Sequence, residues 1–152
     1  MSKVDEIYIC EALKEAKKAF DEDEVPVGAV IVYKNRIIAR GYNQVERLKD
    51  PTAHAEMIAL TSATNLLGTK WLSGSTLYVT IEPCSMCAGA LVLARIDNIC
   101  FGAKDPKTGA CGSVINIVNN KKLNHRIEVR GGILEGECCL LLKEFFKKKR
   151  KK

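Results

Sequence analysis

The chain has 152 residues and a formal net charge of +6, which is the size of one compact domain with its own core. Its apolar fraction of 47% argues against intrinsic disorder. The apolar runs fall short of the ~20 residues that a membrane span needs, and the polar, acidic start at residues 1–6 is unlike a secretory signal. We therefore expect a cytoplasmic, single-domain protein with no membrane segment.

The hydrophobic pattern predicts helices and strands that alternate after an initial hairpin. In chain order we expect a helix at 4–21, strands at 27–33 and 37–42, a helix at 53–66, a strand at 76–81, a helix at 84–95, strands at 98–101 and 126–129, and a closing helix at 134–146. This order predicts an α/β fold in which helices cover both faces of a mixed sheet.

Several short segments mark where these elements begin and end. Thr52 is a candidate cap for the second helix, and Gly68 is its expected stop. We expect a glycine-containing loop at 105–113 and a helical turn at 113–118. The closing helix is expected to fray where the basic tail begins.

The positive charge is concentrated at the end of the chain. All residues from Lys147 to Lys152 are Lys or Arg, and since the whole chain has 24 basic and 18 acidic residues, the remainder is formally neutral. A local basic tail indicates a local polyanionic contact. We therefore expect a domain at 1–146 followed by a basic tail at 147–152.

Two segments place metal-ligand residues where expected helices begin: His54-Ala55-Glu56 and Pro83-Cys84-Ser85-Met86-Cys87. Cys84 and Cys87 are three positions apart, so on a helix they share one face and can bind one ion. The chain has seven cysteines, an odd number, which favours metal ligands or buried thiols over disulfides. We expect His54, Cys84 and Cys87 to bind one Zn²⁺ per subunit.

Glu56 is the candidate general base. It lies two positions after His54, so on a helix it points away from that ligand. Three protein ligands and an open fourth position are typical of catalytic zinc, and a nearby carboxylate is suited to accept a proton from water. The alternative is a structural zinc whose fourth ligand is Cys138 or Cys139, but the His-x-Glu spacing favours catalysis.

His54-x-Glu56 together with Pro83-Cys84-x-x-Cys87 resembles the signature of cytidine and nucleobase deaminases. Further segments are similar to the bacterial tRNA-specific adenosine deaminases over nearly the whole chain: 24–30, 50–56, 105–113, 124–126 and 145–146. The most selective of them is Asp105-Pro106-Lys107-Thr108-Gly109-Ala110-Cys111-Gly112-Ser113. The resemblance implies a three-layer α/β/α cytidine-deaminase-like fold around a mixed five-stranded sheet. It also implies a catalytic homodimer in which the neighbouring subunit shapes each active site.

For the reaction, the resemblance implies hydrolytic deamination of adenosine to inosine at the wobble position of tRNA, with tRNA-Arg as the expected substrate. A zinc-activated water attacks C6 of the base, while Glu56 carries a proton to N1 and then to the departing amine. Backbone N–H groups near Ala55 and Cys84 are candidates to stabilise the developing charge. The expected partner is the anticodon stem-loop of tRNA.

The expected RNA contacts each have a simpler alternative. Asn43 is expected to hold the base edge, but its alternative is to cap a turn. The loop at 105–113 is expected to form a substrate wall, with a plain turn as the alternative, and His125 is expected to contact RNA, with a structural role as the alternative. The full expected set is Val27, Asn43, Ala55, Asp105, Lys107, His125, Phe145, Phe146, Lys147 and Arg150.

Phe145 and Phe146 precede the basic residues of the tail. Aromatic faces stack on unpaired bases, and lysines and arginines neutralise phosphates. The alternative is that both rings face the core and the charges form a solvated end. Because adjacent helical residues point about 100° apart, we expect one ring to be buried and the other to face RNA.

Two other functions are alternatives. A small-molecule deaminase acting on guanine or cytosine shares the zinc motif, but it has no use for a basic aromatic tail. A zinc-stabilised RNA-binding module without catalysis explains the tail, but it leaves Glu56 and the open zinc position without a role.

Overall fold

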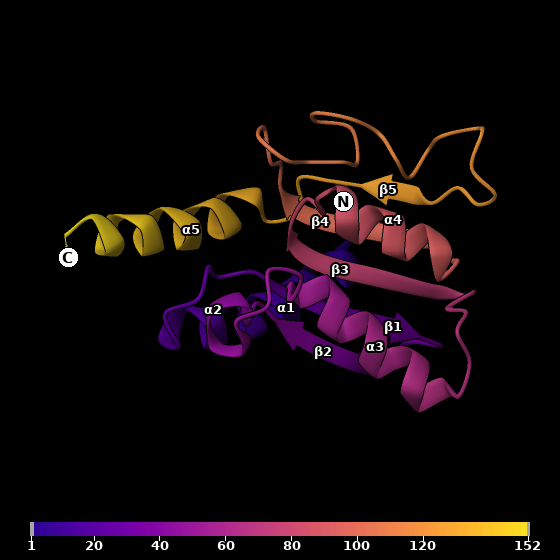
Figure 1. Cartoon of the computed structure of the whole chain (residues 1–152), viewed down its shortest axis with the longest axis horizontal. Helices are drawn as coiled ribbons and strands as arrows, with labels where there is room; N and C mark the ends of the chain where they lie inside the picture. Colours follow the sequence, from indigo (N-terminus) through magenta and orange to yellow (C-terminus); the bar gives the residue numbers. More distant parts are fainter. Residues whose placement is uncertain (1, 152) are drawn as a thin grey trace.

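The computed structural model describes residues 2–151 as a five-stranded sheet with helices on both faces (Figure 1). In chain order the elements are α1 (Lys3–Asp21), β1 (Gly28–Tyr33), β2 (Arg36–Tyr42), α2 (Val45–Leu48), α3 (Ala55–Leu67), β3 (Ser75–Ile81), α4 (Ser85–Leu93), β4 (Asn98–Ala103), β5 (Glu128–Arg130) and α5 (Glu135–Arg150). Met1 and Lys152, at the ends of the expected domain and tail, lie outside the described residues. Along residues 2–151, no helix combines the length and apolar character of a membrane span.

The sheet is mixed and has the strand order β2-β1-β3-β4-β5. β1 pairs antiparallel with β2 and β3, whereas β3 with β4 and β4 with β5 are parallel pairs. The parallel step from β3 to β4 needs a crossover, which α4 supplies. Ile81 and Ala103 pair at the C-terminal end of β3 and β4, so the segments after these two strands leave the sheet side by side. The expected α/β/α fold is confirmed.

Two hydrophobic cores lie on opposite faces of the sheet. Ala29 and Ile31 of β1 join the core under α3 and α4, which cover the face turned to the viewer in Figure 1. Val30 and Val32 join the core under α1 and α5. Successive strand residues point to opposite faces, and helices cover both faces here, so β1 is a nearly continuous apolar run.

Close helix packing sets the depth of α3 against the sheet. An added Cβ at Gly41 would lie 2.5 Å from the carbonyl oxygen of Ala55, so only glycine at this position of β2 admits the first turn of α3. The segment that begins at His54 is therefore held directly over the end of β2.

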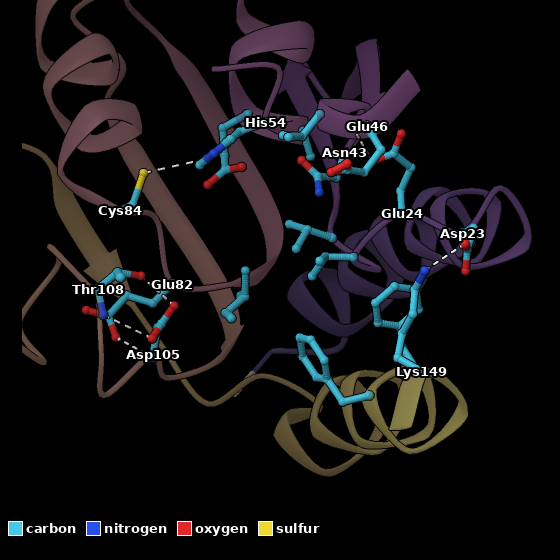
Figure 2. Close-up of a pocket in the computed structure, with 18 residues that line it drawn as sticks. Asp23, Glu24, Asn43, Glu46, His54, Glu82, Cys84, Asp105, Thr108 and Lys149 are labelled. Atoms are coloured by element: carbon cyan, nitrogen blue, oxygen red, sulfur yellow. Dashed lines mark hydrogen bonds and ion pairs between the residues drawn. The ribbon is translucent and has the colours of Figure 1, made fainter. Parts of the chain in front are cut away.

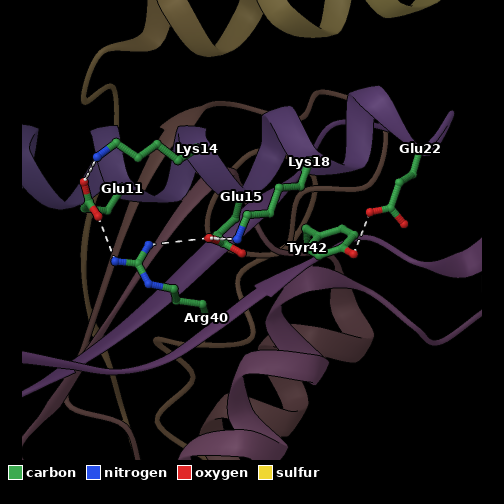
Figure 3. A network of polar contacts seen from close by, with 7 residues as sticks. All are labelled: Glu11, Lys14, Glu15, Lys18, Glu22, Arg40 and Tyr42. Atoms are coloured by element: carbon green, nitrogen blue, oxygen red, sulfur yellow. Dashed lines mark hydrogen bonds and ion pairs between the residues drawn. The ribbon is translucent and has the colours of Figure 1, made fainter.

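Ion pairs connect α1 to the edge strand β2 (Figure 3). The guanidinium of Arg40 lies 2.7 Å from a carboxylate oxygen of Glu11 and 3.5 Å from one of Glu15. At the end of β2, the hydroxyl of Tyr42 donates to Glu22 at 2.7 Å. Partly exposed pairs such as Arg40 with Glu11 contribute little stability singly, but together these contacts fix how α1 lies against β2.

The stretch after β2 contains a short helix, α2, which the sequence analysis did not predict. The carboxylate of Glu24 accepts hydrogen bonds from the backbone N–H groups of Glu46 and Arg47, at 3.0 and 2.7 Å. These donors have no partner within the helix itself. A buried acceptor from a distant segment thus stabilises a turn that the local sequence alone does not specify.

Two local features that the sequence predicted are absent from the described residues 2–151: the cap at Thr52 and the helical turn at 113–118. His54, not Thr52, occupies the N-cap position of α3, and the Thr52 hydroxyl instead donates to Asp50 at 2.7 Å. Residues 113–118 form no helical turn, because the chain folds back there and Asn116 makes an antiparallel bridge with Cys111. The expected stop of α3 at Gly68 is confirmed by its left-handed backbone conformation.

The basic tail is helical rather than frayed. α5 continues to Arg150, so the expectation that the helix frays where the tail begins is wrong. The ring of Phe145 packs on Phe20 with centroids 6.0 Å apart, and Nζ of Lys149 lies 2.7 Å from the carboxylate of Asp23. These contacts with α1 and the segment after it support the last turns of α5.

Candidate active site

Three side chains from the starts of α3 and α4 converge. His54 and Cys84 occupy the N-cap positions of these helices, and Cys87 lies one turn into α4. Nδ1 of His54 lies 3.6 Å from the Sγ atom of Cys84 and 3.6 Å from that of Cys87. The three ligand atoms all lie within 4.8 Å of one another, so the trio identified in the sequence can hold one metal ion.

The protonation of this group in the metal-free chain fits a cation site. Hydrogen bonds from Cys87 and His54 lower the pKa of the Cys84 thiol to about 4. Hydrogen bonding to Cys84 in turn raises the pKa of both Cys87 and His54. One thiolate is thus already present, and the protons on its neighbours are those that a bound cation displaces.

Glu56 lies in the first turn of α3 and is only 3% exposed. Burial raises its pKa to about 7. Its carboxylate does not belong to the converging group of ligand atoms formed by residues 2–151, as the sequence predicted from its offset along the helix. A carboxyl group with this pKa can both accept and release a proton near neutral pH.

His54, Glu56 and Cys84 line a cavity of about 580 Å³ (Figure 2), and Cys87 lies buried behind them. The cavity lies where the C-terminal ends of β3 and β4, the start of α3 and the last turns of α5 meet. Nine residues of the predicted site line it: Val27, Asn43, His54, Ala55, Glu56, Cys84, Asp105, Phe145 and Phe146. Segments far apart in the sequence thus contribute to one site.

Asn43 follows β2 and is 7% exposed. Its backbone N–H donates to the carbonyl of Val27 at 3.1 Å, which fixes its position at the cavity (Figure 2). Its side-chain amide makes no hydrogen bond to residues 2–151. Both a donor and an acceptor are therefore available to a molecule in the cavity.

The two phenylalanines of α5 differ in exposure, as predicted. Phe145 is 3% exposed and Phe146 is 45% exposed, and the rings meet edge to face with centroids 5.4 Å apart. Phe145 therefore anchors α5, whereas Phe146 presents apolar surface at the mouth of the cavity.

The remaining predicted residues lie away from this cavity. Lys107 and Arg150 line a second groove together with Phe146 and Lys149. Lys147 is exposed on α5. Nε2 of His125 lies 2.7 Å from the carbonyl oxygen of Ile96, near the start of β4 and thus at the opposite end of the sheet.

Sequence reasoning missed two buried carboxylates that line the cavity. Glu24 and Glu82 are 1% and 2% exposed. Glu24 holds the start of α2, and Glu82 accepts hydrogen bonds from the loop at 105–113. An acidic residue directly after a buried strand, as in Ile81-Glu82-Pro83, was the available signal, because a buried carboxylate needs donors.

The chain is similar to deaminases over nearly its whole length. The sequence model of the MafB19-like deaminase family matches residues 4–150. The tRNA-specific adenosine deaminase of Bacillus subtilis strain 168 is 51% identical over 148 residues, which cover 97% of this chain and 92% of the relative. A structure from a study of A-to-I editing by tRNA:A34 deaminases has a TM-score of 0.86 and 42% identity, covering 89% of this chain and 98% of that one. A guanine deaminase structure from Nitrosomonas europaea has a TM-score of 0.76 at 25% identity, covering 92% and 83%.

Proposed function

Since the chain belongs to the family of tRNA-specific adenosine deaminases, we propose that it converts the wobble adenosine of a tRNA to inosine by hydrolysis in this cavity. One observation carries the proposal: the buried carboxyl group of Glu56 lines a cavity beside a converging His-Cys-Cys group. A metal site that only stabilised the fold would need neither the cavity nor a buried proton carrier beside it.

We propose that His54, Cys84 and Cys87 hold one Zn²⁺ per subunit. Imidazole nitrogen and thiolate sulfur are ligands that zinc prefers, and three of them leave a fourth position for water. Bound zinc supplies Lewis acidity, which makes water a competent nucleophile at neutral pH. The donor set of this structure fits that metal.

Glu56 moves the proton. Its carboxylate accepts a proton from the attacking water and transfers it to N1 of adenine. It then takes the remaining proton from the oxygen now bound to C6 and delivers it to the amine, which leaves C6 as ammonia. Burial holds the pKa of Glu56 at about 7 in the metal-free chain, which suits a group that must work in both directions. The first N–H groups of α3, at Ala55 on the cavity lining, have no helical partner and stabilise charge that develops on the base.

The walls of the cavity hold the flipped-out nucleoside. Val27 and Ile81 supply apolar surface for the base, and the unpartnered amide of Asn43 recognises a polar edge. Asp105 and Thr108 form the wall opposite Asn43 (Figure 2). This arrangement suits a base that has left its stack.

The anticodon stem-loop, of tRNA-Arg in the first instance, binds across the cavity mouth. The exposed ring of Phe146 stacks on an unpaired base. The basic tail from Lys147 onward, with Lys107 and Arg150 beside the second groove, contacts phosphates, and His125 is a more distant contact. The domain of residues 1–146 and the tail at 147–152 thus act as a catalytic part and an RNA-contacting part of one cytoplasmic enzyme.

The enzyme is proposed to act as a homodimer. Leu66 at the end of α3 and Leu93 at the end of α4 are 65% and 81% exposed. A contiguous exposed apolar patch marks a surface that a partner covers, and we propose that both side chains belong to such a surface. Light scattering of the purified protein tests this, and a mass of one chain at micromolar concentration would contradict it.

A small-molecule deaminase is the second candidate, because the guanine deaminase fold is also similar. One assay separates the two. The protein is incubated with total tRNA and, in parallel, with free guanine and cytosine, and inosine formation is compared with base loss. We expect inosine in tRNA and no loss of the free bases; the reverse result would overturn the proposal.

A further inference from the structure

The carboxylate of Glu82 accepts all its hydrogen bonds from one loop, at residues 105–113. One of its oxygens accepts the backbone N–H of Asp105 at 3.1 Å and also the hydroxyl of Ser113. The other oxygen accepts the N–H of Cys111 at 3.0 Å and that of Ser113 at 3.1 Å. Four donors from the 105–113 loop thus surround one buried carboxylate, which lies beside Asp105 and Thr108 in Figure 2.

The same loop is attached directly to the turn that carries a predicted metal ligand. The N–H of Ala110 donates to the carbonyl of Pro83 at 2.9 Å, and Gly109 forms an antiparallel bridge with Cys84. Glu82 itself precedes Pro83 in the chain. Its side chain and the adjoining backbone therefore hold the loop from two directions.

The packing of the loop on Glu82 leaves no spare room. An added Cβ at Gly109 would lie 2.5 Å from Cδ of Glu82 and 2.5 Å from the carbonyl oxygen of Asp105. Backbone and carboxylate are in contact without an intervening side chain. A small change in the hydrogen-bonding pattern of Glu82 must therefore move the loop.

We infer that Glu82 is a positioning residue for the deamination: it fixes the 105–113 loop against the Cys84 turn, so that the wall formed by Asp105 and Thr108 is ordered before RNA arrives. This inference rests on the proposed function for its substrate. A preorganised wall saves the ordering entropy that binding would otherwise cost. Loss of the carboxylate therefore weakens binding of the RNA more than it slows the chemistry.

Glu82→Gln is the sharpest substitution, because it keeps the shape and removes one acceptor. If the amide nitrogen replaces the first oxygen, the N–H of Asp105 loses its acceptor. If it replaces the second, the N–H groups of Cys111 and Ser113 lose theirs. In either orientation at least one loop amide is left facing a donor.

The test compares wild type and Glu82→Gln, loaded with zinc, on an anticodon stem-loop RNA. We expect KM to rise about tenfold, the order of effect of losing hydrogen bonds to a charged group, while kcat changes by less than about threefold. Zinc content should stay at one per chain. Amide hydrogen exchange should accelerate in the 105–113 loop.

Asp5→Asn is the matched control. Asp5 is another buried carboxylate, 5% exposed, which accepts from Tyr78 and Arg130 on the other face of the sheet. We expect this variant to lower the melting temperature without changing KM. If Glu82→Gln is too unstable to purify, Ser113→Ala removes one of the four donors and should raise KM less, in the same direction.

The outcomes are distinct. An unchanged KM in Glu82→Gln, or a change equal to that of Asp5→Asn, would overturn the positioning role, and so would a loss of kcat that follows loss of zinc. If the wild-type protein forms no inosine, the proposed function fails instead, and hydrogen exchange still reports whether Glu82 holds the loop.

Discussion

Glu56 and Glu82 line the same cavity and are similarly buried, at 3% and 2% exposed, yet their pKa values move in opposite directions. Burial raises the pKa of Glu56 to about 7. Burial also acts to raise the pKa of Glu82, but the donors of the 105–113 loop outweigh it and hold that pKa below its usual value. Glu56, with His54, Cys84 and Cys87, forms the floor of the site. Glu82, with the 105–113 loop, forms its wall.

Hydrogen-bond donors, rather than depth of burial, therefore decide whether each of these buried carboxylates is charged. A carboxylate that satisfies several N–H groups stays charged and holds structure. A buried carboxyl group without such a set of donors is poised to exchange a proton. Substitutions in the floor should therefore change chemistry, and substitutions in the walls should change binding.

The largest effect is expected from the floor. Glu56→Ala should lower kcat by a factor on the order of 10²–10⁴, the contribution typical of a general acid–base group, and should leave one zinc per chain. Metal analysis and kinetics on the same preparation check this. If zinc is lost with the activity, Glu56 is a ligand or a structural support, and the assigned difference between floor and wall is wrong.

The free energy of unfolding of the metal-free protein, measured as a function of pH, should distinguish Glu56 from Glu82. Since the folded pKa of Glu56 is about 7 and its ordinary value is 4.5, its contribution to stability is complete below pH 4.5 and is lost as the pH rises toward 7. The loss amounts to about 3 kcal/mol. Glu56→Gln should remove this decline in urea unfolding curves.

Glu82 should show the opposite sign. Because its folded pKa lies below the ordinary 4.5, its stabilisation is present above pH 4.5 and is lost as the pH falls through the folded pKa. Glu82→Gln should therefore flatten the acid side of the same curve. If Glu56→Gln and Glu82→Gln change the pH dependence of the unfolding free energy in the same way, the opposite pKa shifts assigned to the two residues are wrong.

A smaller effect is expected at the mouth of the cavity. Deleting residues 147–152 should weaken tRNA binding and reduce the salt slope by roughly 0.7 for each phosphate that the protein no longer neutralises. Melting temperature and zinc content should change little, since the Lys149–Asp23 pair is exposed. Lys34→Ser, in the distant hairpin turn, is the charge control. If the truncated protein binds tRNA as tightly as the full chain, with the same salt dependence, the tail is only a solvated helix end.

The smallest effect concerns Asp105 in the wall. Its carboxylate accepts the N–H groups of Lys107 and Thr108 at 3.0 and 3.1 Å and the Thr108 hydroxyl at 2.7 Å. We expect Asp105→Asn to narrow the preference for an RNA hairpin over the matching DNA by a few-fold, because a carboxylate near a ribose 2′-OH accepts from it. Thr108→Val separates loop shape from charge. An unchanged RNA-to-DNA ratio in Asp105→Asn would remove Asp105 from this role.

Local patterns in the sequence were enough to identify the strands, the long helices and the three residues that converge at the metal site. Cys84 and Cys87 are one helical turn apart, so their meeting is a property of the helix itself. The offset of Glu56 from His54 likewise follows from helical geometry. Apolar periodicity located the long helices, each of which buries one stripe against the sheet. Short runs of β-branched and apolar residues located the strands, because helices cover both faces of the sheet.

The tertiary structure alone decided what depends on partners distant in the chain. Glu82 is buried and charged because donors about thirty positions later fold back on it, and no local pattern specifies that return. The same holds for α2, which needs Glu24, and for the helical tail, which needs Phe20 and Asp23. The spacing of side chains along one helix follows from helix geometry and can be predicted from the sequence. A hydrogen bond between residues distant in the chain forms only when the folded sheet brings its donor and acceptor together.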